Sequence, residues 1–302
     1  MPRSGMGRSL ASTIAQRSTG RRTSKERPTA MMFSVVQRIL GLLLGLFSTT
    51  MIPPLVISLA AHDGQAEAFF DALLLILVIG FLIWLPVRRE RREMRGREGF
   101  LVVVLFWVVL GFTGSIPFLL SPTVEMRFTD AVFESVSGLT TTGATVIVGI
   151  EDLPLSLRYY RQQLQWLGGM GIIVLAVAVL PMLGIGGMQL YRAETPGPIK
   201  DHKLTPRIAE TAKALWAIYV RLTVACALAY WAAGMSTFDA VGHAFSTVAI
   251  GGFSTHDASI GYYDSTVIEL IAVIFMFLAG VNFALHFLVW RRRHLAVYLT
   301  DA

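Results

Sequence analysis

Six apolar stretches, separated by polar ones, set the pattern of this 302-residue chain. Each is about long enough for an α-helix that crosses the hydrocarbon core of a bilayer, which takes about 20 residues. The stretches are residues 33–60, 69–86, 100–120, 164–183, 214–234 and 267–290. The pattern therefore predicts an all-α integral membrane protein in which these segments span the bilayer.

Composition and charge agree with this prediction. Hydrophobic residues make up 54% of the chain and the mean hydropathy is +0.60, while charged residues make up 15%, against about a quarter in soluble domains. Most of the basic residues outside the N-terminal region gather at 88–97, 192–213 and 291–293. All three clusters fall on the cytoplasmic side if the N-terminus is cytoplasmic, as the positive-inside rule requires. We attribute the net charge of +6 to basic clusters that orient the chain in the membrane. We therefore expect no nucleic-acid partner.

One stretch between two predicted spans suits neither a helix nor a strand along its whole length. Residues 134–145 include three successive threonines followed by Gly143, and a glycine readily adopts positive φ. Irregular backbone at membrane depth is tolerated only where protein buries it or where it lines a wet cavity. The stretch predicts a short pore helix followed by a re-entrant loop. An ordinary extracellular turn is the alternative.

A second stretch, residues 238–255, repeats this pattern between the next two spans. Aligned on the first without gaps, it places Asp239 on Asp130 and Gly252 on Gly143. An internal repeat of span, short helix, glycine loop and span is hard to explain as two unrelated turns. The repeat favours the pore-loop interpretation.

These loops have the chemistry of a cation filter. Asp130 and Asp239 precede small and apolar residues, where a carboxylate can accept hydrogen bonds from the free N–H groups of a helix and so cap it. The carboxy end of each short helix carries partial negative charge, which favours a cation. Carbonyl groups at residues 141–143 and 250–252 could replace the water around the ion. Because the loops have no ring of carboxylates, we predict K⁺ as the transported ion. We expect no covalently bound cofactor.

Polar residues near the loops allow further hypotheses. His243 aligns with Glu134, and the pair could tune the outer field or, as we favour, pack behind the loops. Residues 151–163 are polar and predict an outer connection, which would place Arg158 and Arg161 near the mouth. We find no metal-ligand spacing, catalytic triad or paired carboxylates, so nothing indicates an enzyme.

Five strings of residues carry a resemblance to a known family. They are TDAVFESVSGLTTTGAT (129–145), QWLGGMGIIV (165–174), GMQLYRAE (187–194), PRIAETAK (206–213) and AIGGFSTHD (249–257). They resemble the Trk/Ktr/HKT superfamily of potassium transporters, and within it the TrkH-type membrane subunits of bacterial uptake systems. The resemblance covers the chain from about residue 32 to its end.

The resemblance implies a K⁺-channel-like fold in the bacterial inner membrane, with an extra helix pair followed by four span–loop–span units around one pore. It implies a homodimer and regulation by a cytosolic nucleotide-binding ring of the TrkA type. The implied K⁺ ligands are Thr141, Thr142, Ile250 and Gly251, and the residues that shape the filter are Thr140, Gly143, Ala144, Ala249 and Gly252.

We expect four parts in this chain: a disordered basic extension (1–30), the extra helix pair with a basic loop (31–98), a first unit (99–190), and a cytoplasmic linker with a second unit (191–302). Two of the four implied units are thus expected here. The favoured hypothesis is K⁺ uptake through a filter of re-entrant loops. A truncated, non-conducting membrane fragment that interacts with such a system or regulates it is the alternative. An alternating-access carrier is less favoured, because the predicted spans contain almost no charged residues.

Overall fold

The computed structural model describes residues 30–89, 96–178, 204–281 and 286, and every regular element within these ranges is a helix. The predicted all-α fold is therefore confirmed for the described part of the chain. Nearly all of the predicted N-terminal extension, most of the cytoplasmic linker and the second half of the last span lie outside the described residues.

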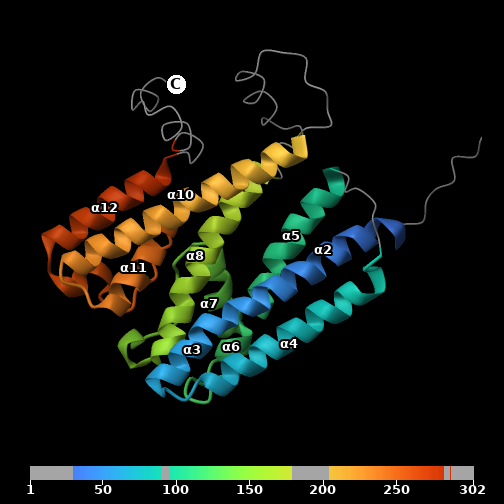
Figure 1. Cartoon of the computed structure of the whole chain (residues 1–302). Helices are drawn as coiled ribbons and strands as arrows, with labels where there is room; N and C mark the ends of the chain where they lie inside the picture. The colour runs from blue at the N-terminus through green and yellow to red at the C-terminus, as the bar shows by residue number, and fades with distance from the viewer. Residues whose placement is uncertain (1–29, 90–95, 179–203, 282–285, 287–302) are drawn as a thin grey trace, which may run out of the picture.

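An extra helix pair comes first. Its elements are α2 (Ala30–Ser48), the 3₁₀ turn η1 (Thr49–Met51), α3 (Ile52–Ala61), α4 (Ala66–Trp84) and the 3₁₀ turn η2 (Leu85–Val87). Helices α2, η1 and α3 form one bent span, and α4 runs back beside it (Figure 1). A Cβ atom added at Gly41 would lie 2.7 Å from the carbonyl oxygen of Gly80, so the lack of side chains there lets α2 and α4 approach closely.

Two further groups of helices follow. The first is α5 (Gly96–Thr113), α6 (Ile116–Leu120), α7 (Phe128–Leu139), the 3₁₀ turn η3 (Ile150–Asp152) and α8 (Leu155–Ala178). The second is α10 (Leu204–Ala232), α11 (Thr237–Ala249), the 3₁₀ turn η6 (Ser259–Tyr263) and α12 (Thr266–Gly280). Helix α8 lies in the middle of the molecule and contacts α3, α7, α10 and α11 (Figure 1). It contributes Tyr160 to one buried apolar cluster and Met170 to the other.

Four helical segments of the described chain are long and apolar enough to cross a membrane. They are Phe33–Ala61, Ala66–Val87, Leu101–Leu120 and Lys213–Ala232, and Thr266–Gly280 is a shorter apolar helix. Many of their large apolar side chains are exposed, as expected of surfaces that face lipid. The chain is an integral membrane protein, as its apolar pattern predicts.

The largest difference from the sequence prediction is in α8. This helix begins at Leu155, so the expected polar connection at 151–163 is wrong for most of its length. The polar side chains of its first turns are buried, with exposed fractions of 0% for Arg161 and Gln162 and 4% for Gln163. Apolar length alone could not reveal this helix, because its first turns carry arginine and glutamine side chains that are buried against protein.

One polar side chain of α8, that of Gln163, stabilises the bend between α2 and α3. Pro53 and Pro54 have no N–H group, so the carbonyl groups of Thr49 and Thr50 lose their usual helical donors. The N–H of Ile52 donates to the Thr49 carbonyl in a 3₁₀ arrangement. The side-chain amide of Gln163 donates to the Thr50 carbonyl at 2.6 Å. A side chain of α8 thus replaces the bond that proline removes, as membrane helices require.

Two more contacts fix the beginning of α8. The Tyr160 hydroxyl donates to the Gly114 carbonyl at 2.9 Å, at the break between α5 and α6. Asp63, in the turn after α3, accepts the N–H of Ser156 at 2.9 Å and the hydroxyl of Ser58 at 2.5 Å. Burial by itself raises the pKa of Asp63, but these hydrogen bonds outweigh it and lower the pKa below its usual value. An ionised Asp63 therefore ties the helix pair to α8.

Replacing Gln163 with methionine keeps most of the volume but removes the donor to Thr50. We expect Gln163→Met to lower the free energy of unfolding by roughly 1–3 kcal/mol, the cost of a buried unsatisfied carbonyl. Thermal unfolding in detergent micelles measures the loss. In a Pro54→Ala background the new N–H at position 54 can bond to the Thr50 carbonyl, so the same substitution should cost clearly less. An equal cost in both backgrounds would contradict this role of Gln163.

Candidate ion-permeation site

Two short helices, α7 and α11, lead into the predicted filter loops. We call residues 140–149 loop 1 and residues 250–258 loop 2. Each helix enters from an extended residue, Arg127 for α7 and Ser236 for α11. Loop 1 leads through η3 into α8, and loop 2 leads into η6.

The aspartates do not cap these helices, which corrects the predicted role of Asp130 and Asp239. Both lie within the first turn. Ser236 caps α11, because its hydroxyl oxygen accepts the N–H of Asp239 at 3.1 Å. The carboxylate of Asp130 accepts the hydroxyl of Thr129 at 3.3 Å, and the residue before α7 makes no side-chain cap. Their negative charge still lies at the helix end that favours it.

The two helices close at their carboxy ends with the same hydrogen bonds. The N–H of Thr142 donates to the Ser137 carbonyl at 2.9 Å, and the N–H of Gly251 donates to the Ser246 carbonyl at 2.8 Å. Both bonds span five residues, as in the Schellman motif that ends many helices. The backbone therefore turns in the same way where each loop begins.

In both loops the turning residue is β-branched. Thr141 and Ile250 each have φ of 54°, a left-handed conformation that costs a residue with a Cβ atom about 1–2 kcal/mol. Glycine is the usual residue at this position of the motif. Strain of this kind persists where the surrounding structure enforces it, and it gathers at functional sites.

Glycines complete the loops and bring them together. Gly143 and Gly252 have φ of 76° and 85°, which a glycine adopts without strain. A Cβ atom at Gly143 would collide with the carbonyl oxygen of Gly251, so the two loops touch through bare backbone. A Cβ atom at Gly252 would have no neighbour within 4 Å.

The predicted ligand residues differ in their surroundings. Thr142 and Ile250 are exposed, and Thr141 is half-buried. Gly251 is buried, with Gly143 on one side and the amide of Gln165 on the other. The four lie in adjoining loop segments, and their assignment as K⁺ ligands stays a prediction.

The predicted filter-shaping residues include two that the structure places in hydrogen bonds. The Ala144 carbonyl accepts the Ser137 hydroxyl at 2.5 Å, so this carbonyl is held against α7. The hydroxyl groups of Thr140 and Thr142 lie 2.8 Å apart, and that of Thr140 also donates to the Val136 carbonyl. Ala249, at the end of α11, packs beside Gly169 of α8.

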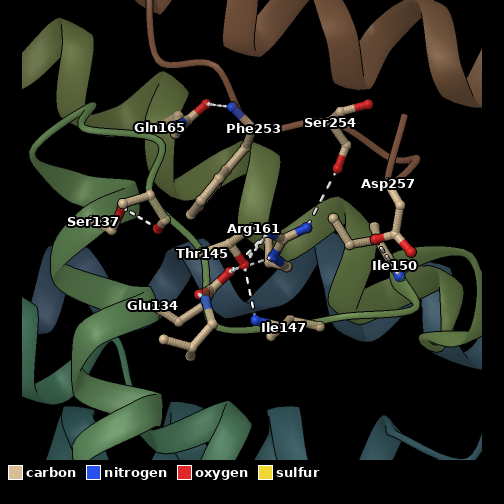
Figure 2. Close-up of polar contacts among 12 residues, drawn as sticks. Glu134, Ser137, Thr145, Ile147, Ile150, Arg161, Gln165, Phe253, Ser254 and Asp257 are labelled. Carbon is tan, nitrogen blue, oxygen red and sulfur yellow. Dashed lines mark hydrogen bonds and ion pairs between the residues drawn. The ribbon is translucent and has the colours of Figure 1, made fainter. Parts of the chain in front are cut away.

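A buried ion pair lies directly behind loop 1. Glu134 of α7 and Arg161 of α8 are both 0% exposed. The Glu134 carboxylate accepts a hydrogen bond from Nε of Arg161 at 2.8 Å and forms an ion pair with its Nη2, also at 2.8 Å (Figure 2). The same carboxylate accepts the Thr145 hydroxyl at 2.7 Å and the Val146 N–H at 3.2 Å. Arg161 thus lies behind the loops rather than near the mouth, which corrects its predicted place.

Arg161 and Gln165 also hold loop 2. Nη1 of Arg161 donates to the Ser254 carbonyl at 3.3 Å, and its guanidinium lies 4.4 Å from the centre of the Phe253 ring. One turn along α8, the side-chain oxygen of Gln165 accepts the Phe253 N–H at 3.0 Å (Figure 2). A single helix therefore fixes both loops, and Arg161 contacts the two at once.

His243, which aligns with Glu134, is buried behind loop 2. Its Nδ1 lies 2.9 Å from the Asp239 carbonyl, and its Nε2 lies 2.9 Å from the Ser254 hydroxyl. Since a carbonyl only accepts, Nδ1 carries a proton. Burial lowers the pKa of His243 and so favours the neutral ring, in which Nε2 accepts from the Ser254 hydroxyl. Both members of the aligned pair thus pack behind the loops, as favoured from the sequence.

The sequence reasoning missed Arg161 and Gln165 as supports of the loops. One signal was available: two arginines and four glutamine or tyrosine residues fill the six positions 158–163, just before an apolar run. In a membrane protein such residues are retained where they bind protein groups.

Comparison with known proteins gives a consistent result. A family model described as TrkH, a cation transport protein, matches residues 65–300. The Trk system potassium uptake protein TrkH of Halomonas elongata is 62% identical over 271 residues, and the match covers 90% of this chain and 56% of that protein. The protein of the same name from Escherichia coli K12 is 59% identical with the same coverage.

A solved structure is similar as well. The crystal structure of the potassium transporter TrkH from Vibrio parahaemolyticus matches with a TM-score of 0.81 at 53% identity, and the match covers 89% of this chain and 55% of that one. The chain spans about half the length of the relatives it matches.

Adding a methyl group at Gly143 tests the contact between the loops. Gly64 has nearly the same left-handed φ, 77°, but a Cβ atom there would meet nothing within 4 Å. We expect Gly64→Ala to cost only the backbone strain, about 1–2 kcal/mol. Gly143→Ala should cost more and should speed amide hydrogen exchange in both loops. Equal costs in thermal unfolding would contradict the contact.

Breaking the ion pair tests its role in stability. Arg161→Gln leaves the Glu134 carboxylate buried without its charge partner, so we expect a loss of roughly 3–5 kcal/mol in the free energy of unfolding. The double variant Arg161→Gln with Glu134→Gln removes both charges and should recover a large part of that loss. Thermal unfolding of the single and double variants measures the coupling, and strictly additive losses would count against the pair.

Proposed function

Because this chain belongs to the TrkH family of cation transport proteins, we propose that it takes part in potassium uptake across the bacterial inner membrane. Its relatives are named as potassium uptake proteins, so the chain is a transport protein rather than an enzyme. Since it spans about half of their length, the activity of the whole relatives is proposed for it.

The observation that carries the proposal is the matched backbone of the two loops. Thr141 and Ile250 adopt the same strained conformation after the same helix closure, and both loops lie at the negative ends of short helices. We propose that carbonyl groups of Thr141, Thr142, Ile250 and Gly251 replace the hydration shell of K⁺. In this proposal the loops supply two sides of a filter whose other sides come from further protein.

The supports behind the loops suit selection among ions. A filter that separates K⁺ from smaller cations must keep its carbonyl groups in place when an ion is bound. Arg161 binds loop 1 through Glu134 and Thr145, and binds loop 2 through the Ser254 carbonyl. We propose that Glu134 and Arg161 together hold loop 1 and loop 2 at a fixed separation.

The arrangement of the helices supports a cytoplasmic N-terminus. The turn between α3 and α4 binds the beginning of α8 through Asp63 and Ser156, so this turn and the outer parts of the loops share one end of the molecule. Arg88 and Arg89 follow the opposite end of α4. We propose that this basic end is cytoplasmic, where a nucleotide-binding ring of the TrkA type would gate the pore. Pairing with a second copy belongs to the same proposal.

Growth of a bacterium that lacks its own K⁺ uptake systems tests the function. The chain is expressed alone, and also joined at its C-terminus to the part of the Halomonas elongata relative that follows the matched region. We expect the joined protein to restore growth at limiting K⁺. Gly143→Ser should abolish the rescue or lower the preference for K⁺ over Na⁺ at least tenfold, a change worth about 1.4 kcal/mol.

Gly64→Ala is the matched control, because it adds left-handed strain outside the loops, where the new Cβ atom meets nothing within 4 Å, and it should leave growth unchanged. Rescue by the unaltered chain alone would mean that it finds the missing sides in a second copy or a host protein. If the joined protein reached the membrane without restoring growth or K⁺ uptake, the proposal would fail. The chain would then fit the alternative of a non-conducting fragment.

A further inference from the structure

A buried histidine at the outer end of the loops lies between two carboxylates. His256 is 7% exposed. Its Nδ1 is 3.4 Å from a carboxylate oxygen of Glu151, in η3 after loop 1, and its Nε2 is 3.4 Å from a carboxylate oxygen of Asp239, in α11. Its ring stacks on Tyr262 with the centroids 3.6 Å apart. The imidazole therefore joins three separate segments.

The two nitrogen atoms of His256 match two acceptors. Neither nitrogen has a hydrogen-bond partner at bonding geometry. A neutral imidazole has one N–H group, so its other nitrogen presents a lone pair to a carboxylate. The imidazolium has two N–H groups and a positive charge, and it can donate to Glu151 and Asp239 together. The pocket thus fits the protonated form of the ring.

The carboxylate of Asp239 is held in its ionised form. It accepts the hydroxyl of Thr255 at 2.7 Å and that of Ser236 at 2.7 Å. Burial alone raises the pKa of Asp239, but these bonds and the nearby His256 outweigh it and lower the pKa below its usual value. Glu151 accepts the N–H of Asp257 at 3.0 Å.

The other titratable groups around His256 leave it as the group that takes up the proton. His243 of α11 stacks 6.3 Å away, but both its nitrogens are already engaged as a neutral ring. Tyr262 and Tyr263 of η6 face the ring, and a tyrosine hydroxyl is neutral over the range in which histidines titrate. Asp257, beside it in the chain, is turned to the N–H groups of Gly149 and Ile150.

We propose that His256 is a proton-binding site at the outer mouth, where the bound proton ties the segment after loop 1 to the helix before loop 2. The link is made by Glu151 on one side and Asp239 on the other. The link exists when the ring is protonated, because only the imidazolium can donate to both carboxylates at once. Protonation of His256 from the external medium therefore strengthens the link between Glu151 and Asp239, and loss of that proton weakens it.

Histidine titration by NMR tests proton binding without any need for transport. The full chain with labelled histidine is reconstituted in nanodiscs, and the signal of His256 is assigned from His256→Gln. We expect Glu151→Gln and Asp239→Asn each to lower the proton affinity of His256 roughly tenfold or more, as loss of an adjacent opposite charge does. His62, exposed in the turn after α3, should titrate unchanged in both variants.

Amide hydrogen exchange tests the link itself. After correction for the intrinsic pH dependence, residues 150–152 and 254–258 should exchange several times more slowly at pH 5.5 than at pH 7.5. His256→Gln should remove this difference, whereas His62→Asn should retain it. Unchanged proton affinity in Glu151→Gln and Asp239→Asn would overturn the site. Exchange in these segments that is independent of pH in the unaltered chain would overturn the link.

Discussion

The ion pair between Glu134 and Arg161 is the interaction on which loop 1 and loop 2 depend. Both side chains are fully buried, and each alone would be a costly charge in a low dielectric. Together they neutralise one another and leave further donors and acceptors for loop 1 and for the Ser254 carbonyl. The pair thus fixes two loops, which are more than one hundred residues apart in the chain, relative to the single helix α8.

The same helix meets a second requirement of a membrane protein, that every buried backbone group finds a partner. Its glutamine, tyrosine and arginine side chains contact the backbone exactly where other elements are irregular: at the bend of the first span, at the break between α5 and α6, and in loop 2. The irregular backbone segments and the polar side chains of α8 therefore stabilise each other. Neither would be stable in a bilayer without the other.

The apolar pattern was enough to predict the all-helical membrane fold, because length and hydropathy follow directly from the thickness of the bilayer. The internal alignment of Asp130 with Asp239 and of Gly143 with Gly252 was enough to locate both loops. The beginning of α8 was out of reach, since Arg161 and Gln163 look like loop residues until their partners are known. The same holds for Ser236, which caps α11 in place of the expected Asp239, because both residue types favour helix starts.

The bond from Gln163 to the Thr50 carbonyl joins residues 113 positions apart, and this separation bears on biogenesis. A ribosome makes the bent first span well before α8, so the hairpin of α2, α3 and α4 enters the bilayer with an unpaired carbonyl at its bend. Until α8 is inserted, water or the insertion machinery has to provide a hydrogen-bond donor for the Thr50 carbonyl. The first hairpin is therefore a provisional structure, and its final shape is set when a later helix docks against it.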